Sequence, residues 1–414
     1  MNFFSKLRSD PWLYVELVSI SLMILSLPSF EAPKNIFLIL FVVASLVHQL
    51  THRSFKAWRL WDSIFLSIIF SGLLSTIFAG LSPGDEWKGF RTLITFISVG
   101  WLLSRSNYSN KQLGWLFGLS ILATVPALCW GLWELLVLHS KDTLQLHSVG
   151  HVNHSAIYLT IIFGASLGFI LSVWNQSSGR YKFLLFFLPA LFYVSLILGQ
   201  SRAAFGIGTL FGMALIYLLS PNKKIKWIGF LILPAIAAVL IFLNAPIIQK
   251  QIENKNNHNV LSGREAIWNV TIEAARLYPA LGIGIDNRAV VTKDIIQKSV
   301  ESHHEIFDES RYDFHFKHSH SFYLTLIAER GILGASVTMI FVIIWLQTLA
   351  RHYLQKKLTG QALYLWAGSA SAWFATFGIG FVNTTFHHEH GILACVFLGL
   401  HLAFLNKKQK NSSI

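Results

Sequence analysis

Residues 318–334 read HSHSFYLTLIAERGILG, and they join the longest polar segment of the chain to an apolar run of membrane length. Ser319 and Ser321 are good N-cap residues, so we expect a helix to begin here. His320 then lies near the positive end of a helix dipole, which disfavours imidazolium. This position predicts a histidine that is neutral at pH 7, as a general base must be. The alternative is a solvated histidine at a helix start.

The composition is that of a protein with many membrane spans. Of the 414 residues, 53% are hydrophobic and 13% are charged, whereas soluble domains carry about 25% charged residues. A membrane helix needs roughly 20 mostly apolar residues. Twelve runs are candidates, and the chain is therefore expected to be an all-α polytopic membrane protein; the runs are 12–28, 35–50, 62–80, 92–104, 113–138, 155–174, 182–199, 203–220, 226–245, 321–350, 362–382 and 391–406.

Three regions follow from these runs. Residues 1–245 hold nine predicted spans, 246–320 form one large polar loop with short helices, and 321–414 hold the last three spans and a basic tail. No small-residue cleavage site follows the first apolar run, so we expect that span to be retained.

The distribution of basic residues predicts the orientation. Lysines and arginines recur in alternate loops, as in the positive-inside bias of membrane proteins; these groups lie at 6–8, 53–59, 105–111, 180–182, 223–226, 351–357 and 407–410. Both termini are then cytoplasmic, and loop 246–320 lies on the outer face with most of the histidines. This bias accounts for the net charge of +13 without a nucleic-acid partner.

Neither a nucleotide nor a metal or other cofactor is predicted. The sequence has no phosphate loop or dinucleotide fingerprint, so an ATP-driven reaction is not expected. Cys129 and Cys395 both lie in apolar runs, which disfavours a disulfide framework or a cysteine metal site. The histidines of His388-Glu389-His390 and of 303–320 lack metal-ligand spacing.

Two arginines are candidate anion ligands on the predicted outer face. Arg202 lies between two apolar runs with almost no loop around it, where an arginine is costly unless it meets an anion or a cavity. Arg264 follows Ser262, a candidate N-cap with Glu265 completing a capping box, so it lies in a first helical turn that favours anions. The alternatives are a snorkelling Arg202 and an Arg264 paired with Glu265.

Arginines beside a neutral histidine, outside the membrane and without ATP, suggest one reaction class. Arginine binds phosphate oxygens bidentately and keeps its charge. A diphosphate leaving group can be held by arginines while the histidine deprotonates an acceptor hydroxyl. Two guanidinium groups can replace the charge of a metal ion. Residues 282–288 add a glycine-bearing turn, expected to approach a ligand closely, and a further arginine, Arg288.

The sequence resembles the bacterial O-antigen ligase and polymerase superfamily. The resemblance rests on His320-Ser321, followed after nine intervening residues by Gly331-Ile332-Leu333-Gly334, on Ser201-Arg202, and on Gly263-Arg264 followed by Trp268, Pro279 and Gly282-Ile283-Gly284. The twelve-span layout extends it to the whole chain. Ser321 replaces the commoner Asn, and Gly206 stands where Leu is frequent.

The resemblance implies a metal-independent glycosyltransferase with a GT-C-like membrane fold and a periplasmic active site in the bacterial inner membrane. A ligase of this family moves a glycan from undecaprenyl diphosphate to a sugar of lipid A–core. By motif, His320 is then the base and Arg202 and Arg264 are catalytic, while Arg288 and His318 are expected to bind substrate.

Other functions remain open. Polymerases and protein O-oligosaccharyltransferases of the superfamily use the same donor class with other acceptors. The large loop directly before His320 and the basic residues around it favour a ligase with a phosphorylated lipid acceptor. Two further alternatives belong to other classes of protein. A transporter would commonly have two related halves, which the sequence lacks. A structural or receptor-like sensor would transfer no glycan, so mutation of His320 would abolish no such activity.

Overall fold

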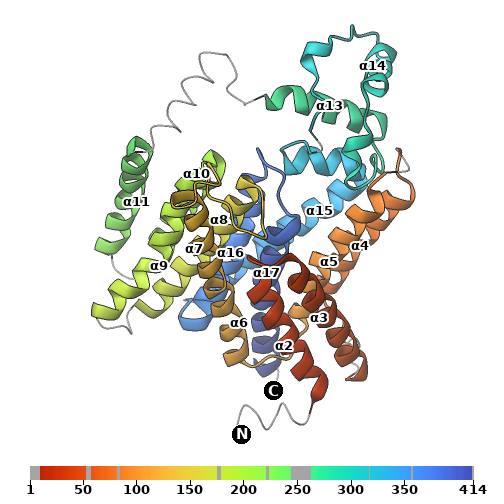
Figure 1. The fold of residues 1–414 in the computed structure, drawn as a ribbon. Helices are drawn as coiled ribbons and strands as arrows, with labels where there is room; N and C mark the ends of the chain where they lie inside the picture. The colour runs from red at the N-terminus through yellow and green to blue at the C-terminus, as the bar shows by residue number, and fades with distance from the viewer. Residues whose placement is uncertain are drawn as a thin grey trace.

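The computed structural model describes residues 10–52, 57–81, 84–174, 179–220, 223–243, 263–316, 318–355 and 358–412. Their secondary structure is helical throughout, without a β-strand in these ranges (Figure 1). The helices are α2 (Pro11–Ser26), α3 (Glu31–Thr51), α4 (Leu60–Ile77), α5 (Glu86–Ser104), α6 (Asn110–Leu122), α7 (Thr124–Leu136), α8 (Val152–Val173), α9 (Gly179–Leu198), α10 (Arg202–Leu219), α11 (Lys223–Leu243), α13 (Arg264–Leu277), η3 (Asn287–Val290), α14 (Lys293–Ser302), η4 (Glu309–Arg311), α15 (Phe322–Gln355), α16 (Gly360–Ile379) and α17 (His388–Ser412).

Many of these helices are long and apolar enough to cross a membrane. Seven meet both criteria within the described residues: Glu31–Thr51, Leu60–Ile77, Asn110–Leu136, Val152–Val173, Arg202–Leu219, Phe322–Gln355 and His388–Lys407. Three shorter apolar helices add Pro11–Ser26, Leu185–Leu198 and Gly229–Val239. The chain is therefore an all-α polytopic membrane protein, as its composition predicts.

Each of the twelve predicted spans overlaps a helix, although the number of crossings stays a prediction. The predicted span 113–138 consists of two helices, α6 and α7, which meet at Ala123. Pro126 explains the break, because it has no N–H to donate to the carbonyl of Leu122. Helices α5 and α16 match predicted spans but are not among the seven apolar ones.

The centre of the bundle is formed by α8 and α17. In the membrane-length part of each helix, 78% of the residues of α8 and 83% of those of α17 are buried inside the protein. Both helices contact α16. The other spans expose apolar side chains outward, as expected for helices that face lipid. Helix α15 also packs on α4 and α16, and its N-terminal end carries the segment with His320.

Helix α15 is broken at Gly331. This residue has φ 61° and ψ −171°, a conformation essentially restricted to glycine. In a continuous helix, the N–H groups of Ile332 and Leu333 would bond the carbonyls of Ala328 and Glu329. The break therefore exposes four backbone polar groups inside an apolar bundle, and each needs another partner.

The segment Pro279–Gly284 supplies these partners, and we call it the strap. Its Ile283 and Gly284 N–H groups donate to the carbonyls of Ala328 and Glu329 at 2.9 and 3.1 Å. In return, Ile332 and Leu333 donate to the strap carbonyls of Pro279 and Ala280 at 2.8 and 3.2 Å. The four groups freed by the break are thus satisfied, and the loop region is fixed to α15.

The strap corrects one expectation from the sequence. The glycine-bearing turn that begins at Gly282 was expected to bring backbone close to a ligand. Instead, it brings backbone close to α15, since a Cβ atom on Gly282 would lie 2.3 Å from the carbonyl carbon of Glu329. The backbone at Gly282 does approach another group closely, and that group is the backbone of the broken helix α15.

The loop region has a small core of its own, which docks on α15. Helices α13 and α14 lie together at one end of the bundle (Figure 1). The core includes a residue of the strap and one of α15; its buried members are Val270, Ala274, Ile283, Val291, Ile296, Val300 and Ala328. Strap and core together set the position of α13 relative to the start of α15.

A glycine at the break is required for this arrangement. A Cβ atom at position 331 would lie 2.3 Å from the carbonyl oxygen of Ala280. We expect Gly331→Ala to lower the free energy of unfolding by roughly 3 kcal/mol, from backbone strain plus overpacking. Thermal unfolding of the solubilised protein measures the effect.

The matched control is Gly118→Ala on α6, where an added Cβ would meet no atom within 4 Å. That variant should unfold at or above the wild-type temperature, because alanine favours helix. Equal unfolding temperatures for Gly331→Ala and the wild type would show that the break does not need glycine.

Candidate active site

His320 lies in a turn directly before α15. Its backbone has φ 52°, an uncommon value for a residue other than glycine. The residues on either side hold it: Ser319 Oγ bonds the carbonyl of Ser321 at 2.8 Å, and Ser321 Oγ accepts from Leu324 N at 3.5 Å. Ser321 is thus the cap that the sequence predicts, and it fixes the chain next to His320.

A second turn supports the start of α15. The N–H of Phe322 lies 2.8 Å from the carbonyl of Gly380 and 3.1 Å from that of Asn383. The segment between α16 and α17 therefore accepts a donor that the helix start would leave unsatisfied. His320 is held in a fixed position between this turn and the loop region.

The imidazole of His320 is held neutral. Burial lowers its pKa from 6.5 to about 4, and the positive charges of Arg264, His318 and His151 act in the same direction. A neutral His320 agrees with the expectation from the sequence, although its largest cause is burial rather than a helix dipole. Neutral imidazole can accept a proton from a hydroxyl group at pH 7.

Arg264 is brought to His320 by α13. Helix α13 is joined to the segment before His320 by two bonds: Trp268 Nε1 donates to the carbonyl of Ser319 at 2.9 Å, and Asp313 N donates to the carbonyl of Ala266 at 3.2 Å. Arg264 lies one turn before Trp268 and is half-buried. Because Trp268 is bonded to the residue before His320, this spacing explains why the charge of Arg264 lowers the pKa of His320.

The local structure at Arg264 differs from the predicted capping box. The N-cap of α13 is Gly263, with φ 75° and no side-chain cap bond, while Ser262 lies outside the described residues. Glycine serves here because it adopts positive φ at no steric cost. No carboxylate of the described chain forms an ion pair with Arg264, which disfavours the pairing with Glu265.

Arg202 joins this group from a third segment. It is the first residue of α10 and is exposed, after a turn in which Gln200 has φ 50°. Its charge lowers the pKa of Arg264, after the larger effect of burial. Arg202, Arg264 and His320 therefore form a connected electrostatic group, although Arg202 and His320 are more than a hundred positions apart. We call this group the Arg–Arg–His site.

The two predicted substrate-binding residues lie differently. His318 is near this group, because its charge acts on His320, and its ring stacks on His387 with centroids 5.9 Å apart. Arg288 is only 2% exposed, and its Nη2 donates to the carbonyl of Asp313 at 3.2 Å. Burial lowers the pKa of Arg288 to about 10 against the pull of Asp313 and Glu329. Its Nη2 therefore joins two parts of the loop region, while Nε and Nη1 are buried without a hydrogen-bond partner among the described residues.

Two adjoining cavities lie beside His318. One has a volume of about 250 Å³ between α5, α15 and the turn before α17, and it is lined by His318, Phe322, Arg330 and His387 among others. The second, of about 430 Å³, contains Lys34, Lys88 and Arg91. Lys88 and His388 line both cavities, so the two cavities adjoin.

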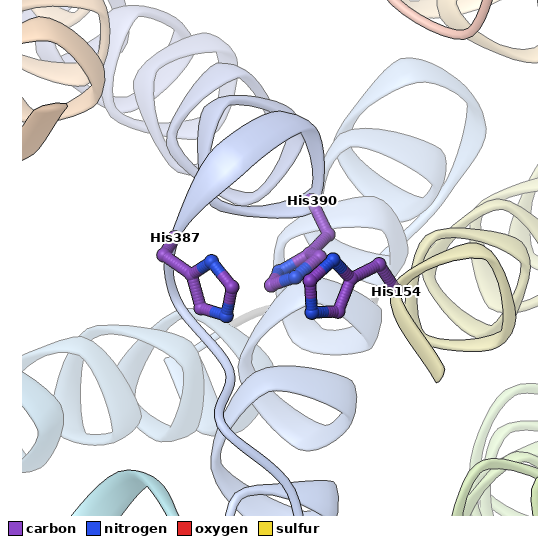
Figure 2. Close-up of side chains that lie close together, drawn as sticks. All are labelled: His154, His387 and His390. Carbon is purple, nitrogen blue, oxygen red and sulfur yellow. The ribbon is translucent and has the colours of Figure 1, made fainter. Parts of the chain in front are cut away.

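A cluster of three histidines was not predicted from the sequence. His154, His387 and His390 bring one ring nitrogen each to within 4.8 Å of one another (Figure 2). Local spacing could not reveal it, because His154 begins α8 and the other two lie at the start of α17. The single sequence signal was the abundance of histidine on the predicted outer face.

Comparison with known proteins indicates a family for the middle of the chain. No curated protein matches the chain. The family model described as O-antigen ligase matches residues 184–339. That range contains Arg202, Arg264, the strap, His320 and the helix break at Gly331. Over these residues the chain is similar to the O-antigen ligase family.

Proposed function

We propose that this protein is an O-antigen ligase, which transfers O-antigen polysaccharide from undecaprenyl diphosphate to a sugar of lipid A–core. The observation that carries the proposal is the Arg–Arg–His site, which lies entirely within the matched residues. The reaction takes place on the periplasmic face of the inner membrane, in agreement with the distribution of basic residues, and both termini are cytoplasmic. The predicted loop 246–320 then lies on the same side of the membrane as the site.

Arg202 and Arg264 bind the diphosphate of the donor. Neighbouring guanidinium groups repel each other; burial is the main cause of the lowered pKa of Arg264, and the charge of Arg202 lowers it further. A diphosphate placed against both would relieve the repulsion with charge-assisted hydrogen bonds. The first turns of α10 and α13, where these arginines lie, also favour an anion.

His320 is the general base. Its Nε2 or Nδ1 lone pair takes the proton of the acceptor hydroxyl, and the acceptor oxygen attacks the anomeric carbon of the donor sugar. The bond from this carbon to the diphosphate oxygen breaks, and the diphosphate leaves with the electron pair. Attack from the side opposite the leaving group inverts the anomeric centre. Since the arginines stabilise the developing charge, this step needs no metal ion.

The two adjoining cavities suit the acceptor. His318 lines the first, and the second is lined by the cations Lys88 and Arg91, which favour a phosphorylated core sugar. A protein acceptor, or the growing chain of another lipid-linked glycan, would make the enzyme a protein O-oligosaccharyltransferase or a polymerase. Both alternatives use the same Arg–Arg–His site, so the acceptor alone distinguishes them.

The transfer reaction tests this proposal directly. We expect the purified protein to join lipid-diphosphate glycan to lipid A–core without added metal ion and without ATP. Loss of the base should lower the rate about 10²–10⁴-fold in His320→Ala, and Arg264→Ala should lose about 10²–10³-fold. Gel electrophoresis follows the transfer, and NMR of the product reports the anomeric configuration.

His304→Ala is the matched control, because His304 is an exposed loop histidine that also has positive φ, at 61°. Its rate should equal that of the wild type. Glycan that lengthens on the donor lipid would identify a polymerase instead. A retained anomer would exclude the single displacement, and full activity of a folded His320→Ala would exclude His320 as the base.

The dependence of transfer on pH tests the electrostatic link between Arg264 and His320. Because the pKa of His320 is lowered to about 4, kcat/KM should stay high down to well below pH 6.5. The fall of kcat/KM at low pH, its acid limb, reports the protonation of His320. Removing the charge of Arg264 removes one cause of this lowering. The limb of Arg264→Gln should therefore move to higher pH, in addition to the loss of rate.

The control for this shift is Arg311→Gln, which removes an exposed arginine of η4 that does not act on His320. Its acid limb should coincide with that of the wild type. An Arg264→Gln profile with an unshifted limb would show that Arg264 does not control the protonation of the base.

A further inference from the structure

The three-histidine cluster lies where two central helices begin. His154 is in the first turn of α8, His390 is in the first turn of α17, and His387 directly precedes α17. Figure 2 shows the three rings facing a common space from these two sides. Their centroids are 4.7 Å (His154–His387), 4.9 Å (His387–His390) and 5.3 Å (His154–His390) apart.

Hydrogen bonding leaves lone pairs in this space. His387 Nε2 lies 3.0 Å from the carbonyl of Thr384, so Nε2 carries the proton and Nδ1 keeps its lone pair. A backbone carbonyl bonded to the outer ring nitrogen is a common feature of metal-binding histidines, because it fixes tautomer and orientation. In this tautomer Nδ1 is the nitrogen of His387 that is available to bind a cation.

His390 provides an independent indication of a ligand. Its side chain is fully buried, and neither ring nitrogen has a hydrogen-bond partner among the described residues. Buried polar atoms are nearly always bonded, since an unsatisfied one loses its hydration without compensation. A cation bound by the ring would supply the missing partner of one nitrogen.

The donor set selects the kind of cation. The adjacent carboxylate, Glu389, forms a buried ion pair with Lys34, so the cluster offers neutral imidazole nitrogens. Imidazole suits zinc, copper, nickel and iron, whereas magnesium and calcium require oxygen ligands. Three histidines with one open position form a common zinc coordination set.

We propose that His154, His387 and His390 bind one divalent transition-metal ion of the zinc class. Zn–N bonds of about 2.0–2.1 Å place tetrahedral ligands about 3.4 Å apart. The three nitrogens already lie within 4.8 Å of one another, so small side-chain rotations close the site. The inference rests on this geometry and is independent of the proposed transfer reaction.

The ion would fasten the segment between α16 and α17 to the start of α8. The same segment accepts the Phe322 N–H through Gly380 and Asn383, and thereby holds the start of α15 next to His320. His387 also stacks on His318. The metal site therefore has a structural role next to the Arg–Arg–His site, and its ligands take no part in the transfer step.

Cobalt binding tests the site without reference to activity. The full chain is purified in detergent through a tag without histidine, stripped with chelator, freed of chelator and titrated with Co²⁺. We expect visible d–d absorption that saturates at one equivalent and is displaced by Zn²⁺. Zn²⁺ should also raise the thermal unfolding temperature of the wild type.

Variants define the ligands. His154→Gln and His390→Gln should weaken Co²⁺ binding by at least about 100-fold. His388→Gln is the matched control, because His388 is exposed and its ring lies 5.6 Å from that of His154, outside the ligand set. It should bind as the wild type does. If His390→Gln fails to fold, His387→Gln tests the same set of ligands, because His387 precedes α17 and its substitution leaves the helix sequence unchanged.

Three results would overturn the proposal. They are a wild type that binds no Co²⁺ at micromolar concentrations, folded His154→Gln and His387→Gln proteins that bind as tightly as the wild type, and a His388→Gln protein that loses binding.

Discussion

The pairing of the strap with the broken helix α15 is the constraint on which the rest of the site depends. Four backbone groups freed at Gly331 bond to Pro279–Gly284, and unsatisfied groups of this kind are very costly inside a membrane protein. The pairing fixes the loop region to the bundle. Helix α13 is thereby fixed as well, and it delivers Arg264 to His320. The glycines Gly282 and Gly331 thus serve backbone geometry, while the proposed chemistry is assigned to charged residues.

Electrostatics within the site follow from this placement. Burial and the nearby Arg264 keep His320 neutral, and Arg202 acts on Arg264. Two neighbouring guanidinium groups at helix N-termini match the charge of an anionic substrate. A diphosphate donor meets this demand, and its charge increases as the glycosidic bond breaks. The same two arginines would therefore serve both binding and catalysis.

Much of this organisation could be predicted from the sequence, because it depends on local patterns. Apolar runs predict the helices, Ser321 predicts the start of α15, and the motifs around Arg202, Arg264 and His320 indicate the family. Contacts between distant segments could not be predicted. Neither the strap nor the cluster of His154 with His387 leaves a local signal, since each joins residues far apart in the chain.

One local expectation failed for a specific physical reason. The capping box at Arg264 is replaced by Gly263 in a left-handed conformation, which propensity alone does not distinguish from a serine cap. Substrate binding by Arg288 stays a prediction: its Nη2 donates to the carbonyl of Asp313, while Nε and Nη1 have no hydrogen-bond partner among the described residues. Whether an arginine meets a ligand or a carbonyl depends on tertiary packing, which the sequence around it does not specify.

The most direct measurement is a cryo-EM structure of the full chain with a donor analogue in which a CH₂ group replaces the anomeric oxygen, so that transfer is blocked. The account predicts that the diphosphate lies between the guanidinium groups of Arg202 and Arg264, with the His320 ring facing the anomeric carbon on the side opposite the diphosphate. A diphosphate bound elsewhere, for example at Lys88 and Arg91, or a His320 ring directed away from the sugar, would contradict it.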